Sequence, residues 1–277
     1  MPRRKRHAPG DTVYHVINRG NGRAEVFHKD DDYAAFIKIL SLAAERHNMR
    51  ILAYCLMPNH FHLVLWPRGD SDLSAFMQWL TTCHVRRYHK YYKSSGHVWQ
   101  GRYKSFPIQD NKHLLTVLKY VERNPVRAKL VQKSQDWKYS SARFWVGETG
   151  TGSLLRRGSG GLVPVPFSPV VLAGALADNF AGKGEQAGSE PESGSGTSLR
   201  SEPDPDSSIV SWLFEGPTSR PRPWLRFVNR VQAQEALRKL RLAVQRGSPF
   251  GDDEWIQNAA MKMGLESTLK PRGRPKR

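Results

Sequence analysis

The order of periodic segments in the first 125 residues most constrains how this chain folds. Four segments have the composition or the apolar alternation that is typical of strands: residues 12–18, 50–57, 60–66 and 103–109. Apolar residues recur at helical spacing in three segments, which begin at Asp30, at Ser71 or Asp72, and at Asp110. The order β-α-β-β-α-β-α predicts an α+β fold, a ferredoxin-like split βαβ antiparallel sheet with helices on one face and the other face left for a ligand.

The composition of the chain changes after Trp145. The following stretch, to about residue 220, is dominated by Gly, Ser, Pro and Glu, and buries too little apolar surface to offset the entropy cost of ordering it. Helical periodicity returns over residues 224–246 and 254–263, and the chain ends in KPRGRPKR. We therefore predict a domain at 1–145, a flexible Gly/Ser/Pro-rich insert at 146–222, and a helical C-terminal extension with a basic tail at 223–277.

The charge of the chain favours a nucleic-acid partner. Its 277 residues include 43 Lys and Arg against 25 Asp and Glu, a formal net charge of +18. Basic side chains that meet phosphates release condensed counterions, which drives binding to nucleic acid. Basic and aromatic residues also alternate at 84–92 (HVRRYHKYY) and 99–106 (WQGRYKSF), a composition suited to backbone contacts and base stacking on single strands. For either stretch alone, a solvated helix face is the alternative interpretation.

Other classes of protein are disfavoured. The only cysteines are Cys55 and Cys83, which excludes a disulfide scaffold and a cysteine-rich zinc module. No stretch approaches the roughly 18 consecutive apolar residues of a membrane-spanning helix. The basic N-terminus is not followed by the apolar segment of a secretory signal. We expect a cytoplasmic, nucleoid-associated protein with no membrane partner.

Two pairs of residues carry candidate chemistry. His60 and His62 alternate with Phe61 in a predicted strand, so both imidazoles point to one face and can share a divalent cation, although such pairs are more often structural. Tyr120 and Asn124 are four residues apart on a helix that ends at Pro125, which places them one turn apart on one face. A rim tyrosine with a hydrated hydroxyl is the alternative for Tyr120.

Taken together, these residues and their surroundings resemble the REP-associated tyrosine transposases, a family of the HUH single-tyrosine transposase superfamily. The resemblance is carried by AYCLMPNHFHLVL (53–65), GHVWQGRYKSFPIQ (96–109) and HLLTVLKYVERNPVRAKLV (113–131), followed by Trp137 and Ser140-Ser141. The C-terminal segment 247–277 is also similar to the end of many of those proteins. The connection at 146–222 departs from the family, in which a much shorter one is expected.

This resemblance implies an enzyme that cuts one DNA strand with a tyrosine nucleophile. Tyr120 would attack the scissile phosphate and form a 5′-phosphotyrosine with a free 3′-OH, a linkage that another 3′-OH can reverse. His60, His62 and Asn124 would bind one Mg²⁺ or Mn²⁺. The substrate would be a single strand or the hairpin of a palindromic repeat, with no small-molecule substrate, bound by a monomer or a homodimer.

By the same resemblance, DNA contacts are assigned to a set of basic and aromatic residues. The set is Arg19, Arg86, Arg87, Lys90, Trp99, Arg102, Lys104, Lys270, Arg272 and Arg274. Three alternatives stay open. The chain could keep the fold and bind repeats without cutting them, or be a replication-initiator nuclease with the same paired histidines. It could also be a zinc hydrolase that adds His84 or His97 to the pair, although no glutamate is placed beside the pair as a general base.

Overall fold

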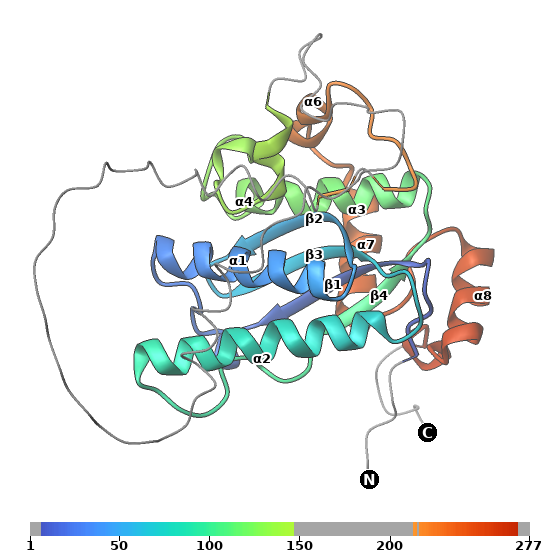
Figure 1. The fold of residues 1–277 in the computed structure, drawn as a ribbon. Coiled ribbons are helices and arrows are strands. Elements are labelled where there is room, and N and C mark those ends of the chain that lie inside the picture. Colours follow the sequence, from blue (N-terminus) through green and yellow to red (C-terminus); the bar gives the residue numbers. More distant parts are fainter. Residues whose placement is uncertain (1–6, 147–212, 215, 271–277) are drawn as a thin grey trace, which may run out of the picture. The chain divides into compact units, whose positions relative to one another are not determined.

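Residues 7–146, 213–214 and 216–270 are described by a computed structural model (Figure 1). The predicted insert at 146–222 therefore lies outside the described residues except at its two ends, as do the first six residues and most of the basic tail. None of the helices within the described ranges is long and apolar enough to cross a membrane.

A four-stranded antiparallel sheet forms the centre of the fold, with the strand order β2-β3-β1-β4. The strands are β1 (Val13–Arg19), β2 (Arg50–Met57), β3 (His60–Trp66) and β4 (Lys104–Ile108). Helix α1 (Asp30–Arg46) connects β1 to β2, and α2 (Asp72–Tyr92) connects β3 to β4. This order and pairing confirm the predicted α+β class and the split βαβ topology.

Different side chains lie on the two faces of the sheet because side chains alternate along each strand. Phe61 points to the face that α1 and α2 cover (Figure 1), where its ring centroid lies 5.3 Å from that of Phe36 and 5.1 Å from that of Trp99. His60 and His62 point to the opposite face. The predicted helices on one face correspond to α1 and α2, whereas α3 (Lys112–Glu122) lies over part of the face left for a ligand.

The end of α3 is set by a proline. The helix begins after Asn111, whose side-chain oxygen accepts a hydrogen bond from the backbone N–H of His113 at 2.9 Å. Pro125 occupies the first turn of the short helix α4 (Asn124–Arg127), where its missing N–H is not needed. The chain therefore starts a new turn directly after α3, at Asn124.

The chain that follows the predicted insert packs onto the same domain. Leu213 forms a parallel bridge with Ile51 of β2, and Phe250 forms one with Ile108 of β4. The helices of this part are α6 (Trp224–Asn229), α7 (Gln234–Arg246) and α8 (Asp253–Met263). Single turns of 3-10 helix occur as η1 (Asn21–Arg23), η2 (Ser134–Asp136), η3 (Ser141–Trp145) and η5 (Glu266–Thr268).

One helical segment predicted from the sequence is two helices in the structure. Periodicity over 224–246 predicted a continuous helix, but the backbone is extended at Arg230 and Ala233, between α6 and α7. Gln232 lies within this break, is buried, and donates its side-chain Nε2 to the backbone oxygen of Thr116 at 3.0 Å. This hydrogen bond attaches the segment between α6 and α7 to α3.

A buried carboxylate joins α3 to the C-terminal part of the chain. The Oε1 atom of Glu122 accepts hydrogen bonds from Ser141 Oγ at 2.7 Å and from Trp145 Nε1 at 3.2 Å, and its Oε2 atom accepts one from Trp224 Nε1 at 2.5 Å. Burial raises the pKa of this carboxyl, while the nearby charge of Arg220 and these donors oppose the rise. Helix α6 is thereby attached to the helix that carries Tyr120.

Candidate active site

The paired histidines of β3 lie beside β1 on the face opposite α1 and α2. His62 is directly across from Ile17 of β1, and His60 is directly across from Arg19. The centroids of the two imidazoles are 5.1 Å apart, with their planes nearly perpendicular. The strand alternation seen in the sequence therefore does place both rings together on one face, as predicted.

Hydrogen bonds fix one nitrogen of each imidazole. His60 Nδ1 lies 2.6 Å from the side-chain oxygen of Asn59, and His62 Nδ1 lies 2.8 Å from Nε2 of His15. Within the described part of the chain, the Nε2 atoms of His60 and His62 have no hydrogen-bond partner. Burial lowers the pKa of His60 to about 4 and that of His62 well below its ordinary value, so both rings are neutral near pH 7. A neutral ring with an unpaired nitrogen is the form that binds a metal ion.

Tyr120 reaches these histidines from α3. Its ring centroid lies 5.8 Å from that of His62 and 6.1 Å from that of His15, in both cases edge-on. The guanidinium of Arg127 covers the ring at 3.8 Å from its centroid and donates to the backbone oxygen of Tyr120 at 2.9 Å. The structure thus brings together a phenol and a pair of imidazoles that are separated by about sixty residues of sequence.

Asn124 lies in the same pocket, at the start of α4. Its side chain is largely buried, and its Nδ2 atom has no hydrogen-bond partner among the described residues. No group of three or more His, Cys, Asp or Glu in the described ranges is placed to bind a metal ion. Among the described residues that line the pocket, Asn124 offers an amide oxygen as a third ligand beside His60 and His62. Two neutral imidazoles with one amide oxygen suit Mn²⁺ or Mg²⁺, so the residues present fit the ion that the resemblance implies.

These residues surround a pocket of about 320 Å³. Its described lining contains three arginines and neither aspartate nor glutamate: Ile17, Arg19, His60, His62, Tyr120, Asn124, Arg127, Ala128, Arg241 and Val244. A pocket with this charge suits an anion, and a planar guanidinium suits the oxygens of a phosphate in particular.

Three residues near this site were not predicted from the sequence. Arg127 follows Tyr120 by seven residues, a helical spacing that could have indicated it. His15 lies in a predicted strand, but only the register of β1 against β3 shows that it reaches His62. Arg241 is about 120 residues from Tyr120 in sequence, and no local pattern links the two.

The residues assigned to DNA contacts are divided between the two faces. Arg19 lines the pocket, and Lys104 lies opposite Ile17 on the pocket side of β4. Arg86, Arg87 and Lys90 belong to α2, on the other side of the sheet. Arg102 is exposed in the loop before β4, and Lys270 is exposed near the end of the described chain, whereas Arg272 and Arg274 lie outside the described residues.

Trp99 is in the core rather than on the surface. Only 6% of it is exposed, and its ring packs against Phe61 and His84 on the α1/α2 side. Its ring is therefore not available for a base to stack on. His84, the residue considered as a further zinc ligand, is buried on the same side, so the sheet separates it from His60 and His62.

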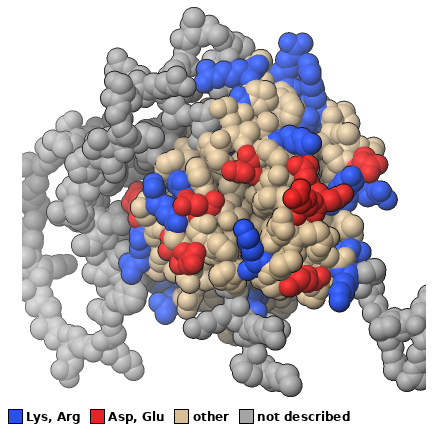
Figure 2. Space-filling view, turned by 90° about the vertical axis from the view of Figure 1, so that its right-hand side faces the viewer, with Lys and Arg blue, Asp and Glu red and all other residues tan. Residues whose placement is uncertain are grey.

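The positive charge of the chain does not cover every face of the domain. Figure 2 shows the side on which α8 lies, where Lys and Arg are interspersed with groups of Asp and Glu. A net charge of +18 therefore does not by itself locate a DNA-binding surface. The arginine-lined pocket around Tyr120 indicates an anion-binding site more specifically.

Comparison with known proteins shows which transposases this chain is similar to. Residues 10–124 match the family model described as "Transposase IS200 like". Over 108 residues the chain is 32% identical to a candidate REP-associated tyrosine transposase of Haemophilus influenzae, and this alignment spans 35% of the chain and 61% of that relative.

Two solved structures are also similar. One is a REP-associated tyrosine transposase bound to a REP hairpin, with 19% identity and a TM-score of 0.44 over 59% of this chain and 98% of that one. The other is a candidate transposase from Deinococcus radiodurans, with 21% identity and a TM-score of 0.32 over 44% of this chain and 97% of that one. The family model and the sequence relative confirm the resemblance predicted from the sequence over residues 10–124, from β1 to Asn124, which is less than half of the chain.

Proposed function

We propose that this protein cuts and rejoins single-stranded DNA at repeat hairpins, in a metal-dependent reaction with a 5′-phosphotyrosine intermediate. The observation that supports this best is the position of Tyr120, edge-on to His62 in a pocket whose described lining has three arginines and no carboxylate. A phenol placed beside neutral imidazoles and guanidinium groups suits attack on a phosphodiester.

The chain's own residues would perform most of the reaction. Arg19 and Arg127 would hold the non-bridging oxygens of the scissile phosphate, and the stacking of Arg127 on Tyr120 would fix the ring for attack. The Tyr120 oxygen bonds to phosphorus, the bond from phosphorus to the 3′ oxygen breaks, and the phenolic proton ends on the released 3′-OH. A divalent cation held by His60, His62 and Asn124 would polarise the phosphate and stabilise the leaving oxygen.

The same linkage would allow rejoining without a nucleotide cofactor. A phosphotyrosine keeps the phosphodiester bond energy, so the 3′-OH of another strand can attack it and release Tyr120. His60, His62 and Tyr120 come from one chain in this structure, so a monomer contains a complete set. The relative's description as REP-associated favours a repeat as the substrate. We propose that its hairpin is processed in the cytoplasm, at the nucleoid.

Covalent trapping on DNA tests this proposal. The protein is incubated with Mn²⁺ and a labelled repeat hairpin that carries single-stranded flanks, and adducts that survive denaturation are separated on a gel. We expect an adduct whose labelled peptide contains Tyr120, and its loss in EDTA and in the Tyr120→Phe variant, which keeps the ring and its packing.

A matched control tests whether the loss of adduct is specific to Tyr120 or follows from the removal of any tyrosine. Tyr91→Phe changes an exposed tyrosine on α2, on the other side of the sheet, and should leave the yield of adduct unchanged. Hairpin binding by the parent protein with no adduct in Mg²⁺ or Mn²⁺ would instead support a non-catalytic repeat-binding protein. Adduct formation by Tyr120→Phe would show that another residue is the nucleophile.

A further inference from the structure

Helix α7 lies outside the segment that matches the transposase family, yet it forms one wall of the pocket. The family match ends at Asn124, and α7 spans Gln234–Arg246. Arg241 and Val244 of this helix line the pocket together with Tyr120. The site that holds the phenol is therefore completed by a part of the chain to which the family match assigns no role.

The apolar face of α7 explains its position. Leu237, Leu240 and Ala243 recur at helical spacing and are buried, and the helix contacts α3 and β4. Glu235, Arg238, Lys239 and Leu242 are on the exposed side. The orientation of α7 is thus fixed by its buried face, and this leaves a charged face beside the pocket.

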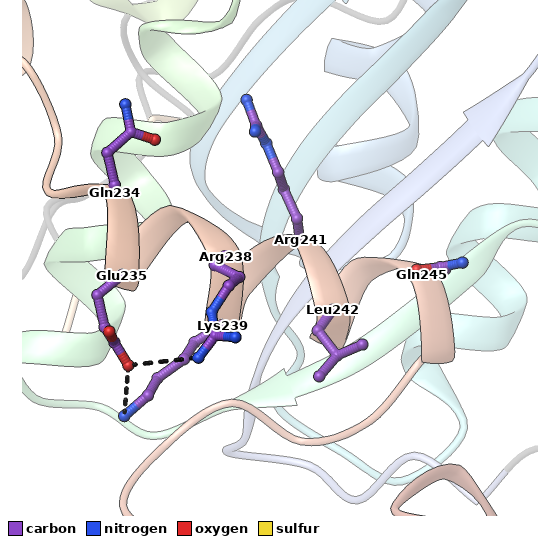
Figure 3. A pocket seen from close by; sticks show the side chains of 7 residues that line it. All are labelled: Gln234, Glu235, Arg238, Lys239, Arg241, Leu242 and Gln245. Carbon is purple, nitrogen blue, oxygen red and sulfur yellow. Dashed lines mark ion pairs between the residues drawn. The ribbon is translucent and has the colours of Figure 1, made fainter. Parts of the chain in front are cut away.

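A second hollow of about 760 Å³ runs along this exposed face, lined by Gln234, Glu235, Arg238, Lys239, Arg241, Leu242 and Gln245 (Figure 3). Arg241 lines both this hollow and the pocket of Tyr120, so the two adjoin. In Figure 3 the side chain of Arg241 extends away from those of Arg238 and Lys239. A ligand that follows the hollow would therefore pass Arg241 on its way to Tyr120.

The charges on this face are poorly neutralised within the described chain. Arg241 has no hydrogen bond or ion pair with any described residue. Arg238 and Lys239 both pair with Glu235 at 3.8 Å, in exposed ion pairs that contribute little. Arg127 and Arg241 line one pocket, where their like charges repel each other. Burial lowers the pKa of Arg127, Tyr120 opposes this shift, and the charge of Arg241 adds to it. A bound phosphate would relieve that repulsion.

We propose that the exposed face of α7 binds the single-stranded DNA that leads into the pocket, with Arg241 contacting the phosphate next to the scissile one. Arg238 and Lys239 contact phosphates farther along the strand. Leu242, which is 43% exposed on the same face, offers an apolar surface for a base. A single strand fits better than a duplex, because the phosphate next to Tyr120 must enter a pocket of about 320 Å³. This inference rests on the proposed function.

Salt-dependent binding tests the inference in the Tyr120→Phe background, where no cleavage interferes. The probe is a fluorescent repeat hairpin with single-stranded flanks, titrated by anisotropy over a series of NaCl concentrations. The variant combines Arg238→Gln, Lys239→Gln and Arg241→Gln. The control combines Lys38→Gln, Arg46→Gln and Lys262→Gln, which removes the same charge from exposed positions on α1 and α8.

We expect the α7 variant to bind the flanked hairpin about tenfold or more weakly and to lower the slope of log Kd against log salt by about two, since each phosphate contact on a single strand contributes about 0.7. The charge-matched control should lose far less affinity, and both should bind a blunt hairpin like the parent. Equal losses in the two variants, or an equal loss with the blunt hairpin, would overturn the inference. Failure of the proposed function would look different: the protein with Tyr120 intact would bind the flanked hairpin through α7 but form no covalent adduct.

Discussion

The Nε2 atom of His15 lies 2.8 Å from the Nδ1 atom of His62, and the two rings are stacked with an interplanar angle of 13°. His15 comes from β1 and is fully buried, and its own Nδ1 atom has no partner among the described residues. When His62 donates its Nδ1 proton to His15, the Nε2 atom of His62 carries a lone pair toward the pocket. A partner of this kind fixes the tautomer and the orientation of a metal-binding imidazole.

Replacement of His15 should therefore weaken metal binding. In His15→Phe the ring is retained but cannot accept a hydrogen bond, so the tautomer of His62 is no longer set, and we expect Mn²⁺ affinity to fall about tenfold or more. The loss can be measured from free Mn²⁺ by electron paramagnetic resonance, without DNA. The matched control is His84→Phe, the same change at a buried histidine on the other side of the sheet. Equal Mn²⁺ affinity in both variants would contradict the role of His15.

Glu122 is expected to stabilise the attachment of the C-terminal part of the chain. Glu122→Ala removes the buried acceptor that Ser141, Trp145 and Trp224 share, which should lower the free energy of unfolding by about 3 kcal/mol or more. Urea titration followed by tryptophan fluorescence gives the value. Glu45→Ala, at an exposed position of α1, should change it by less than about 0.5 kcal/mol. Similar losses for the two variants would show that the cluster contributes little.

His84 should make the stability of the protein depend on pH. It lies on α2, buried against Phe36 of α1, and burial, with the charge of Arg87, lowers its pKa to about 3 from the ordinary 6.5. Between pH 3 and pH 6.5 the unfolded chain binds a proton at His84 that the folded chain does not bind. The stabilisation by a neutral, buried His84 is therefore fully present above pH 6.5 and is lost as the pH falls toward 3. Between pH 6.5 and 5 the loss amounts to about 2 kcal/mol.

The His84→Phe variant lacks this titration. Its unfolding free energy relative to that of the parent should therefore rise by about 2 kcal/mol between pH 6.5 and pH 5, as measured by urea unfolding at both values. His97→Gln changes an exposed histidine and should follow the parent at both pH values. A difference between His84→Phe and the parent that does not vary with pH would rule out a neutral buried His84.

Local sequence patterns predicted most of the fold. The bounds predicted for β2 and β3 agree with the structure, and those for β1 and β4 differ by one residue at each end. The break between α6 and α7 was missed, because the apolar spacing continues across it while the hydrogen bond from Gln232 to Thr116 depends on tertiary packing. The extended backbone there could not be inferred from periodicity.

The candidate site could also be predicted only in part. His60 and His62 share a face because of strand alternation, so this pair could be predicted from the sequence. Tyr120 and Asn124 line one pocket, but Asn124 begins α4 instead of continuing α3, so helical spacing alone does not place it. Trp99 was assigned to DNA contact by the resemblance, yet it is buried, because neither a resemblance nor composition shows which side of a loop faces the core. The roles of these residues in binding and cutting DNA remain proposals.

Arg241 reaches the Tyr120 pocket from a helix that begins more than one hundred residues after the family-matched segment ends. A fragment cut after residue 145 would consequently retain the phenol and both imidazoles but expose one side of their pocket to solvent. Chimeras that graft residues 10–124 onto a similar protein would meet the same difficulty, so both residues 10–124 and α7 would have to be transferred together.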